Sequence, residues 1–254
     1  TTLANSLAQS LGLSHQRVQF TSDMLPADLL GVSIFNQVSQ EFTFHRGPVF
    51  NQLVLGDEIN RASPKTQSAL LEAMAEKQVS IDGETYKLPE PFFVIATQNP
   101  QEHAGTFELP DSQLDRFLMR VTLGFPSVEA EKRMLQQSFN NKSLSPLIDL
   151  TALVDIQQQV NEVITSEAVI DYILRLVGET RSNNEYIQAL SPRATRALLA
   201  ASKAWAFVEG RTYVLPEDVQ AVLPSVCEHR LRGGSHGSAS SLSEQLLRSV
   251  NPLA

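Results

Sequence analysis

The sequence predicts an α/β domain built on a parallel β-sheet flanked by helices, followed by a small domain that is entirely helical. Continuous apolar runs alternate with helical patterns in the first half of the chain, which is typical of strands buried on both faces of a parallel sheet. From Pro126 onward the sequence shows only helical periodicity. We therefore expect an α/β domain at residues 1–125, a helical domain at 126–232, and a flexible linker with a short closing helix at 233–254.

The strands of the sheet are expected in short runs that are rich in apolar residues. A run of this kind, bounded by turn or helix signals, has the length of a buried strand. The last such run ends where the helical periodicity begins, so it would close the α/β domain. The expected strands are RVQF (17–20), QLVLG (52–56), FFVIAT (92–97) and FLMRVTLGF (117–125).

Helices and hairpins between these strands are indicated by local signals. Residues 1–11 place three leucines on one face of a helix. Ser63-Pro64 starts a second helix, which runs to about Glu76, because the serine hydroxyl caps it and proline lacks an N–H that the first turn cannot use. Two hairpins are expected, one across residues 32–48 and one at 79–88 with Asp82-Gly83 as its turn.

Composition excludes several classes of protein. With 254 residues, 42% of them apolar, the chain can bury a sizeable core, and it contains no apolar run long enough to span a membrane. A formal charge of −8 argues against a non-specific nucleic-acid surface. The single cysteine, Cys227, lies in an apolar helical pattern, which favours packing over reactivity. We expect a soluble, cytoplasmic protein.

Two carboxylates follow the apolar run at 52–56 directly. Asp57 and Glu58 would lie at the carboxyl end of a parallel strand, where ligands collect in such sheets. An Asp in this position can hold Mg²⁺, and a Glu beside it can polarise a water for attack on a γ-phosphate. A solvated acidic turn is the alternative interpretation of the pair taken alone.

Polar and cationic residues at three further positions are candidates for the same site. Gln98 and Asn99 end the run at 92–97 and could position the attacking water, although an Asn before a proline is also a common turn residue. Arg116 precedes the run at 117–125, where a surface salt bridge is the alternative. Arg193 stands in the first turn of a helix, where it opposes the helix dipole, so an external anion becomes a plausible partner.

The order of these features resembles that of the AAA+ ATPases, and the amino-acid sequence is similar to that of the MoxR family. The stretches that carry the resemblance are GPVFNQLVLGDEINRASPKTQSALLEAMAEKQVSIDG and LPEPFFVIATQNPQEHAGTFELPDSQLDRF, and the resemblance extends from residue 1 to about 250. It implies an AAA+ core with a helical lid, ATP and Mg²⁺ as cofactors, and hydrolysis of ATP.

The resemblance also implies a role for each candidate residue. Asp57 and Glu58 correspond to the Walker B pair, which holds Mg²⁺ and activates water. Asn99 corresponds to the first sensor. Arg116 corresponds to an arginine finger that reaches the γ-phosphate bound by a neighbouring subunit, and Arg193 to the second sensor, which contacts the nucleotide from the lid.

Partners are implied by the same resemblance. A finger acting between subunits implies a homo-oligomeric ring, in this family a hexamer. The segment at about 25–46 resembles the insert in the second helix that marks one branch of these ATPases, and would be a surface for a partner or substrate. The family implies chaperone-like remodelling or maturation of protein complexes or metal centres, with a partner that carries a von Willebrand factor A domain.

The chain departs from the pattern at its beginning. It contains no G-x-x-x-x-G-K-[ST] phosphate-binding loop. Its first residues resemble the stretch that comes after the lysine of that loop, so Thr1 would supply the hydroxyl ligand of Mg²⁺. We expect an N-terminal segment of several tens of residues, carrying the loop and one central strand, to precede Thr1 in the native polypeptide.

Two other function classes are weighed against the ring ATPase. A nucleotide-gated scaffold with little hydrolysis is disfavoured by the complete set of Glu58, Asn99, Arg116 and Arg193, which a scaffold does not need. A nucleic-acid motor is disfavoured by the net charge and by the segment VSIFNQVSQEFTF (32–44), which contains no Lys or Arg.

Overall fold

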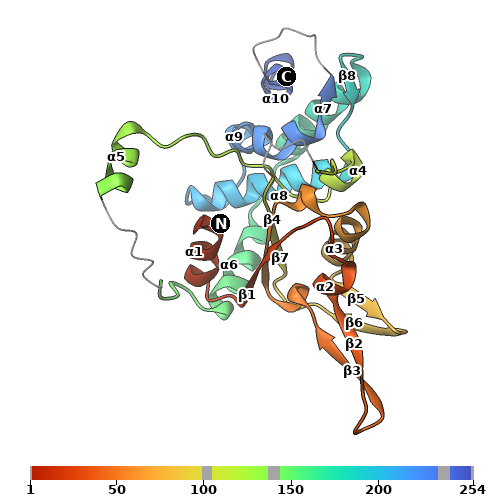
Figure 1. Ribbon diagram of the computed structural model, residues 1–254. Helices are drawn as coiled ribbons and strands as arrows, with labels where there is room; N and C mark the ends of the chain where they lie inside the picture. Colours follow the sequence, from red (N-terminus) through yellow and green to blue (C-terminus); the bar gives the residue numbers. More distant parts are fainter. Residues whose placement is uncertain (1, 99–104, 137–143, 234–240, 253–254) are drawn as a thin grey trace. The chain divides into compact units, whose positions relative to one another are not determined.

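The computed structural model describes residues 2–98, 105–136, 144–233 and 241–252 (Figure 1). Its internal contacts divide the chain into two compact units, Thr1–Arg116 with Ser143–Val154, and Phe117–Lys142 with Asp155–Ala254. The division therefore falls at residue 116, and not at 125, where the sequence changes to helical periodicity. Among the described residues, no helix combines the length and the apolar character that crossing a membrane requires.

The first unit is built on a three-stranded parallel sheet in the order β1-β4-β7. Each strand was predicted from its apolar run, and the parallel α/β fold is confirmed. Every residue of the central strand is buried, with β1 and β7 paired to its two edges and α1 packed against Leu53 and Leu55 on one face. The strands are β1 (His15–Gln19), β4 (Leu53–Asp57) and β7 (Phe93–Ala96).

Helix α1 (Thr2–Ser10) covers one face of this sheet. Ala4 and Ala8 are its buried residues, and they pack against Leu53 and Leu55 of β4. Small alanine side chains allow the helix to approach the sheet closely. The predicted helix at residues 1–11 is confirmed for the residues that the structure describes.

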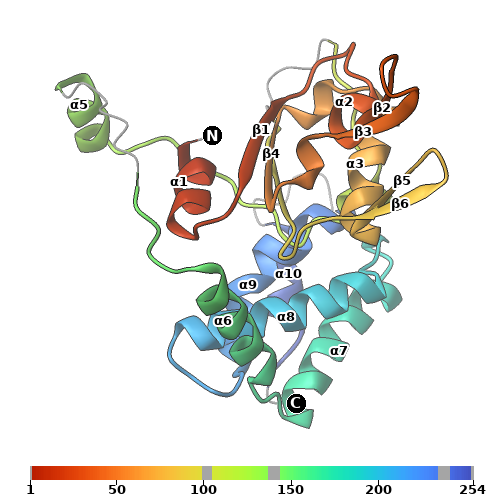
Figure 2. The same ribbon diagram turned by 90° about the horizontal axis from the view of Figure 1, so that it is seen from below.

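Helix α3 (Pro64–Glu76) begins as the sequence predicts, since the Ser63 hydroxyl accepts a hydrogen bond from the backbone N–H of Thr66 at 3.3 Å. Leu70 and Leu71 are buried on its inner face. Figures 1 and 2 show α3 beside the short helix α2 and the two hairpins. The remaining short elements are α2 (Pro26–Leu30), η1 (Pro48–Phe50), η2 (Ile59–Arg61) and α4 (Asp111–Leu114).

Both predicted hairpins are present. The first pairs β2 (Gly31–Asn36) with β3 (Glu41–Arg46), and the second pairs β5 (Gln78–Ile81) with β6 (Glu84–Lys87). Gly31 is required at the start of the first hairpin, because its φ is 107° and a Cβ would lie 2.3 Å from the His45 carbonyl oxygen. The hairpins meet at the rings of Phe44 and Tyr86, which stack with centroids 4.3 Å apart.

The prediction of a strand at 117–125 was wrong. These residues form no helix or strand, and several of their apolar side chains are exposed, Phe125 at 95%. A strand needs a neighbour that offers backbone groups, and β7 pairs only with β4 in the part of the chain that the structure describes. The segment's backbone instead bonds to a helix of the second unit, where Arg120 N–H donates to the Ser225 carbonyl at 2.8 Å.

The second unit is mainly helical, as expected. Its core gathers Tyr172, Leu176, Leu198 and Leu223, together with Leu246 of the closing helix. Two short strands, β8 and β9, pair within the stretch that was expected to be wholly helical. The elements from residue 128 onward are α5 (Val128–Gln136), α6 (Leu150–Glu162), which begins in the first unit, α7 (Glu167–Ser182), β8 (Tyr186–Gln188), α8 (Pro192–Val208), α9 (Pro216–Cys227), η3 (Glu228–Arg230), β9 (Arg232–Gly233) and α10 (Leu242–Ser249).

The closing helix α10 is part of this helical unit. The Glu228 carboxylate accepts hydrogen bonds from the backbone N–H groups of Leu242 and Ser243, at 3.2 and 2.7 Å, which is the preferred place for a negative charge at a helix start. The linker predicted just before α10 lies, except at its ends, outside the described residues. Cys227 is buried as predicted, and burial raises the pKa of its thiol to about 12.

Candidate active site

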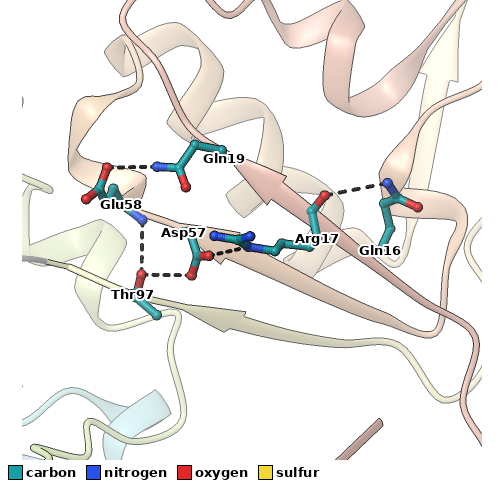
Figure 3. A network of polar contacts seen from close by, with 6 residues as sticks. All are labelled: Gln16, Arg17, Gln19, Asp57, Glu58 and Thr97. Atoms are coloured by element: carbon teal, nitrogen blue, oxygen red, sulfur yellow. Dashed lines mark hydrogen bonds and ion pairs between the residues drawn. The ribbon is translucent and has the colours of Figure 1, made fainter. Parts of the chain in front are cut away.

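The predicted acidic pair lies at the carboxyl end of the central strand. Asp57 is the last residue of β4 and is only 4% exposed. The parallel register places Gln19, at the end of β1, opposite Asp57, and Thr97 directly follows β7. All three strand ends therefore meet at one edge of the sheet, where they build a polar network (Figure 3).

The Asp57 carboxylate is held from both sides. Its Oδ2 accepts a hydrogen bond from Nε of Arg17 at 2.7 Å, and its Oδ1 accepts one from the Thr97 hydroxyl at 3.2 Å. The Arg17 side chain is 53% exposed, so this ion pair adds little to the stability of the fold. What it fixes is the orientation of a buried carboxylate.

Glu58 is held by different partners. Its backbone has a φ of 56°, in the left-handed region, which strains a non-glycine residue by about 1–3 kcal/mol; Lys77, at the end of α3, and Asp82, in the β5–β6 turn, adopt the same conformation. The backbone N–H donates to the Thr97 hydroxyl oxygen at 3.0 Å. The carboxylate Oε2 accepts from Gln19 at 2.7 Å and from Arg61 at 3.0 Å. The left-handed turn thus separates the two neighbouring carboxylates onto different sets of donors (Figure 3).

The chemistry of these residues fits Mg²⁺ bound together with a nucleotide. This ion keeps several waters and takes one or two carboxylates plus phosphate oxygens, and Asp57 supplies such a carboxylate at the edge of the sheet. Over the residues described, no group of three or more His, Cys, Asp or Glu side chains could enclose a metal ion. Asp57 would hold such an ion together with phosphate oxygens.

The other predicted site residues are placed differently. Arg116 belongs to the first unit, and its Nη1 donates to the Leu71 carbonyl oxygen of α3 at 3.0 Å. Arg193 belongs to the second unit, exposed in the first turn of α8, whose cap is Ser191. Thr1 and Asn99 lie outside the described residues. Among the predicted residues that are described within the first unit, the structure brings Asp57 and Glu58 together at the sheet edge, and it places Arg116 on α3.

Four partners of the acidic pair were not among the predicted site residues: Arg17, Gln19, Arg61 and Thr97. Arg17 and Gln19 are two positions apart in β1, so their side chains point to the same face of the sheet. At Thr97, the prediction chose Gln98 and Asn99, the amides that follow it. The signal for Thr97 is its position immediately after a buried strand, as for Asp57. It becomes informative only once β4 and β7 are known to be neighbours, because the two residues are 40 positions apart in the chain.

A parallel sheet with a buried Asp and a left-handed Glu at the end of its central strand, together with a helical unit, fits the class of AAA+ ATPases. In agreement, residues 1–119 match a family model described as the ATPase family associated with various cellular activities (AAA), and residues 178–249 match the AAA lid domain. The chain belongs to the MoxR family of AAA+ ATPases, whose activity is the hydrolysis of ATP.

Several relatives support this assignment. The chain is 43% identical to the uncharacterized protein YeaC of Bacillus subtilis, over 91% of its own length and 73% of that protein's. It is 39% identical to the chaperone MoxR1 of Mycobacterium tuberculosis, of which it spans 64%, and 30% identical to protein MoxR of Methylorubrum extorquens, of which it spans 75%. A crystal structure of a candidate ATPase from Cytophaga hutchinsonii superimposes with a TM-score of 0.88 at 37% identity, covering 98% of this chain and 81% of that one.

Proposed function

We propose that this protein works as a ring-forming ATPase in which Glu58 polarises the water that attacks the γ-phosphate. The observation that carries the proposal is the left-handed Glu58, which follows a buried Asp57 at the sheet edge and directs its carboxylate away from that residue. Asp57, with the Thr1 hydroxyl, would hold Mg²⁺. The ion, when bound with ATP, neutralises negative charge on the phosphates.

Glu58 can accept a water without losing its present partners. Gln19 and Arg61 both donate to Oε2, so the carboxylate has a defined resting position beside β1, and no described residue donates to Oε1. A water placed by Asn99 would hydrogen-bond to Oε1, and this oxygen would take its proton.

Two arginines would stabilise charge on the nucleotide. Arg116 is an exposed residue whose guanidinium is anchored on α3 of its own chain, which suits a group presented to the γ-phosphate of a neighbouring subunit. Arg193 is exposed at the start of α8, where no carbonyl of the helix itself needs a cation. We assign it to the nucleotide bound by its own subunit, as the second sensor of the lid.

We further propose a homo-oligomeric, hexameric ring that remodels or matures protein complexes or metal centres in the cytoplasm. One relative is named a chaperone, which supports a protein client. We also propose a partner protein that carries a von Willebrand factor A domain, and we propose no role for nucleic acid. The β2–β3 hairpin, which belongs to the proposed helix-2 insert, supports a protein-binding role, since Ile34, Phe35, Val38 and Phe42 are each about half exposed or more.

A nucleotide-gated scaffold with little hydrolysis is the second candidate. It is favoured by one observation, the pair of donors that already hold Glu58, since a carboxylate so bound can maintain shape without activating water.

The test compares ATP turnover by the complete polypeptide with that of Glu58→Gln, with sedimentation of both in the presence and absence of ATP. The matched control is Glu72→Gln, on the exposed face of α3. Turnover lost only in Glu58→Gln, with ATP-dependent assembly beyond a dimer, supports the ring ATPase. Equal, negligible turnover in wild type and Glu58→Gln supports the scaffold.

A further inference from the structure

A buried amide on α3 holds the turn that follows Glu58. The Gln67 side chain is fully buried, and its Nε2 donates to the carbonyl oxygens of Ile59 and Ala62, at 3.2 and 3.1 Å. These two carbonyls lie in and directly after η2, the single turn that begins with Ile59. The amide therefore fixes the backbone to which the strained Glu58 is attached.

The same amide reaches the segment that leads to Arg116. Its Nε2 also lies 3.2 Å from the Phe107 carbonyl oxygen, and Phe107 N–H donates to the Asn60 carbonyl at 2.6 Å. Four residues further along α3, the Leu71 carbonyl accepts the hydrogen bond from Arg116. Residues 67 and 71 share one helical face, so a single face of α3 contacts both the turn after Glu58 and the proposed finger.

The Gln67 amide serves backbone carbonyls while its own oxygen has no partner among the described residues. Its Nε2 lies within hydrogen-bond distance of three carbonyl oxygens, which an apolar side chain such as methionine would leave without this donor. The side chain is therefore defined by what its Nε2 holds in place.

We propose that Gln67 is a positioning residue for ATP hydrolysis, which keeps the Glu58 turn and the segment before Arg116 in one fixed arrangement on α3. The inference rests on the proposed roles of Glu58 and Arg116. Among the described residues, the Gln67 side chain donates only to backbone carbonyls, so it acts through the placement of those residues and not on the substrate.

The first test is Gln67→Met in the complete polypeptide, which keeps the length of the side chain and removes the donor. We expect kcat to fall by about 10- to 100-fold, because small displacements of catalytic groups have effects of this size, while KM for ATP changes less than about threefold. The matched control is Thr66→Val. Thr66 is the neighbouring buried polar residue of α3, and its hydroxyl bonds to the Met24 carbonyl at 2.7 Å and to the Ser63 hydroxyl at 3.1 Å, so Thr66→Val removes a buried polar group from the same helix and keeps the Gln67 donor.

A second variant, Gln67→Glu, separates positioning from packing. Burial raises the pKa of a carboxyl, and in its neutral form the group can donate a hydrogen bond to one of the three carbonyls. We expect the ratio of its kcat to that of the wild type to rise as the pH is lowered from about 9 to 6.5. A ratio that does not change with pH would count against the proposal.

The outcomes are distinct from those of the Glu58 experiment. A folded Gln67→Met variant with the kcat of the wild type overturns the inference. The inference also fails if Thr66→Val, with the same loss of Tm as Gln67→Met, shows the same loss of kcat. If Glu58→Gln is inactive while Gln67→Met is not, only this inference fails. If Glu58→Gln retains turnover, the proposed role of Glu58 fails first.

Discussion

The Thr97 hydroxyl oxygen joins the two acidic residues of the site, since it lies 3.2 Å from Asp57 Oδ1 and 3.0 Å from the backbone nitrogen of Glu58. The hydroxyl donates to the carboxylate and accepts from the N–H, so it uses both of its capacities. It thereby ties the end of β7 to the end of β4 at the point where the chain turns into its left-handed residue. The geometry of the acidic pair depends on this side chain.

We predict that Thr97→Val lowers kcat for ATP by about tenfold or more and lowers the free energy of unfolding by roughly 1–3 kcal/mol. The substitution preserves shape but leaves the Asp57 oxygen and the Glu58 N–H without this partner. Thr97→Ser should retain most activity, because it keeps the hydroxyl. Steady-state turnover and urea unfolding measure the two effects.

The control for this prediction is Thr85→Val, which removes a hydroxyl from the exposed hairpin β5–β6, where it bonds to Ser80. That variant should leave kcat unchanged. Activity of Thr97→Val within twofold of the wild type would show that the acidic pair keeps its geometry without the hydroxyl.

We predict that Arg17→Met lowers the Mg²⁺ concentration needed for half-maximal turnover. Arg17 bonds Asp57 Oδ2 and so competes with a cation for the same carboxylate. Because the Arg17 side chain is 53% exposed, the effect should be modest, about fivefold or roughly 1 kcal/mol. Titration of Mg²⁺ at saturating ATP measures it.

Arg133→Met, on the exposed surface of α5, is the control for the removal of one positive charge. A Mg²⁺ requirement that rises in Arg17→Met, and not in the control, would mean that Arg17 supports the ion site and does not compete with it.

We predict that the Arg211–Asp218 ion pair stabilises the second unit by an amount that depends on pH. Burial by itself raises the pKa of Asp218, but hydrogen bonds from Arg211 and from Leu215 N–H, with the guanidinium charge, lower it below the usual 3.8 overall. A carboxyl whose pKa is lower in the folded state contributes stability that is present above pH 3.8 and is lost as the pH falls through the folded value.

Asp218→Asn should therefore destabilise the unit by about 2–4 kcal/mol at pH 7, because Arg211 loses its partner and the start of α9 loses an acceptor. The difference from the wild type should shrink as the pH falls below 3.8 and through the lower folded pKa of Asp218, because the wild-type carboxyl then becomes neutral as well. Denaturant unfolding at both pH values tests this. Asp171→Asn, exposed on α7, should have little effect at either pH, and an equal loss in both variants would refute the prediction.

Local patterns were sufficient for much of the fold and for the centre of the site. The strands at 52–56 and 92–97, the capped helix after Ser63 and the acids after the central strand were all predicted, because each depends on residues that are neighbours in the chain. The placement of Asp57 at a strand end follows directly from the length of the apolar run before it.

The tertiary structure decided what depends on residues far apart in the sequence. An apolar run at 117–125 has the composition of a strand, but no partner pairs with it among the described residues. Thr97 and Gln67 are ordinary in the sequence, and only strand register and burial show that they hold the acidic pair and its following turn. The amino-acid sequence alone therefore determined which segments can be strands and where Asp57 and Glu58 lie. Pairing between residues tens of positions apart determined which strands form and which side chains hold these two carboxylates in place.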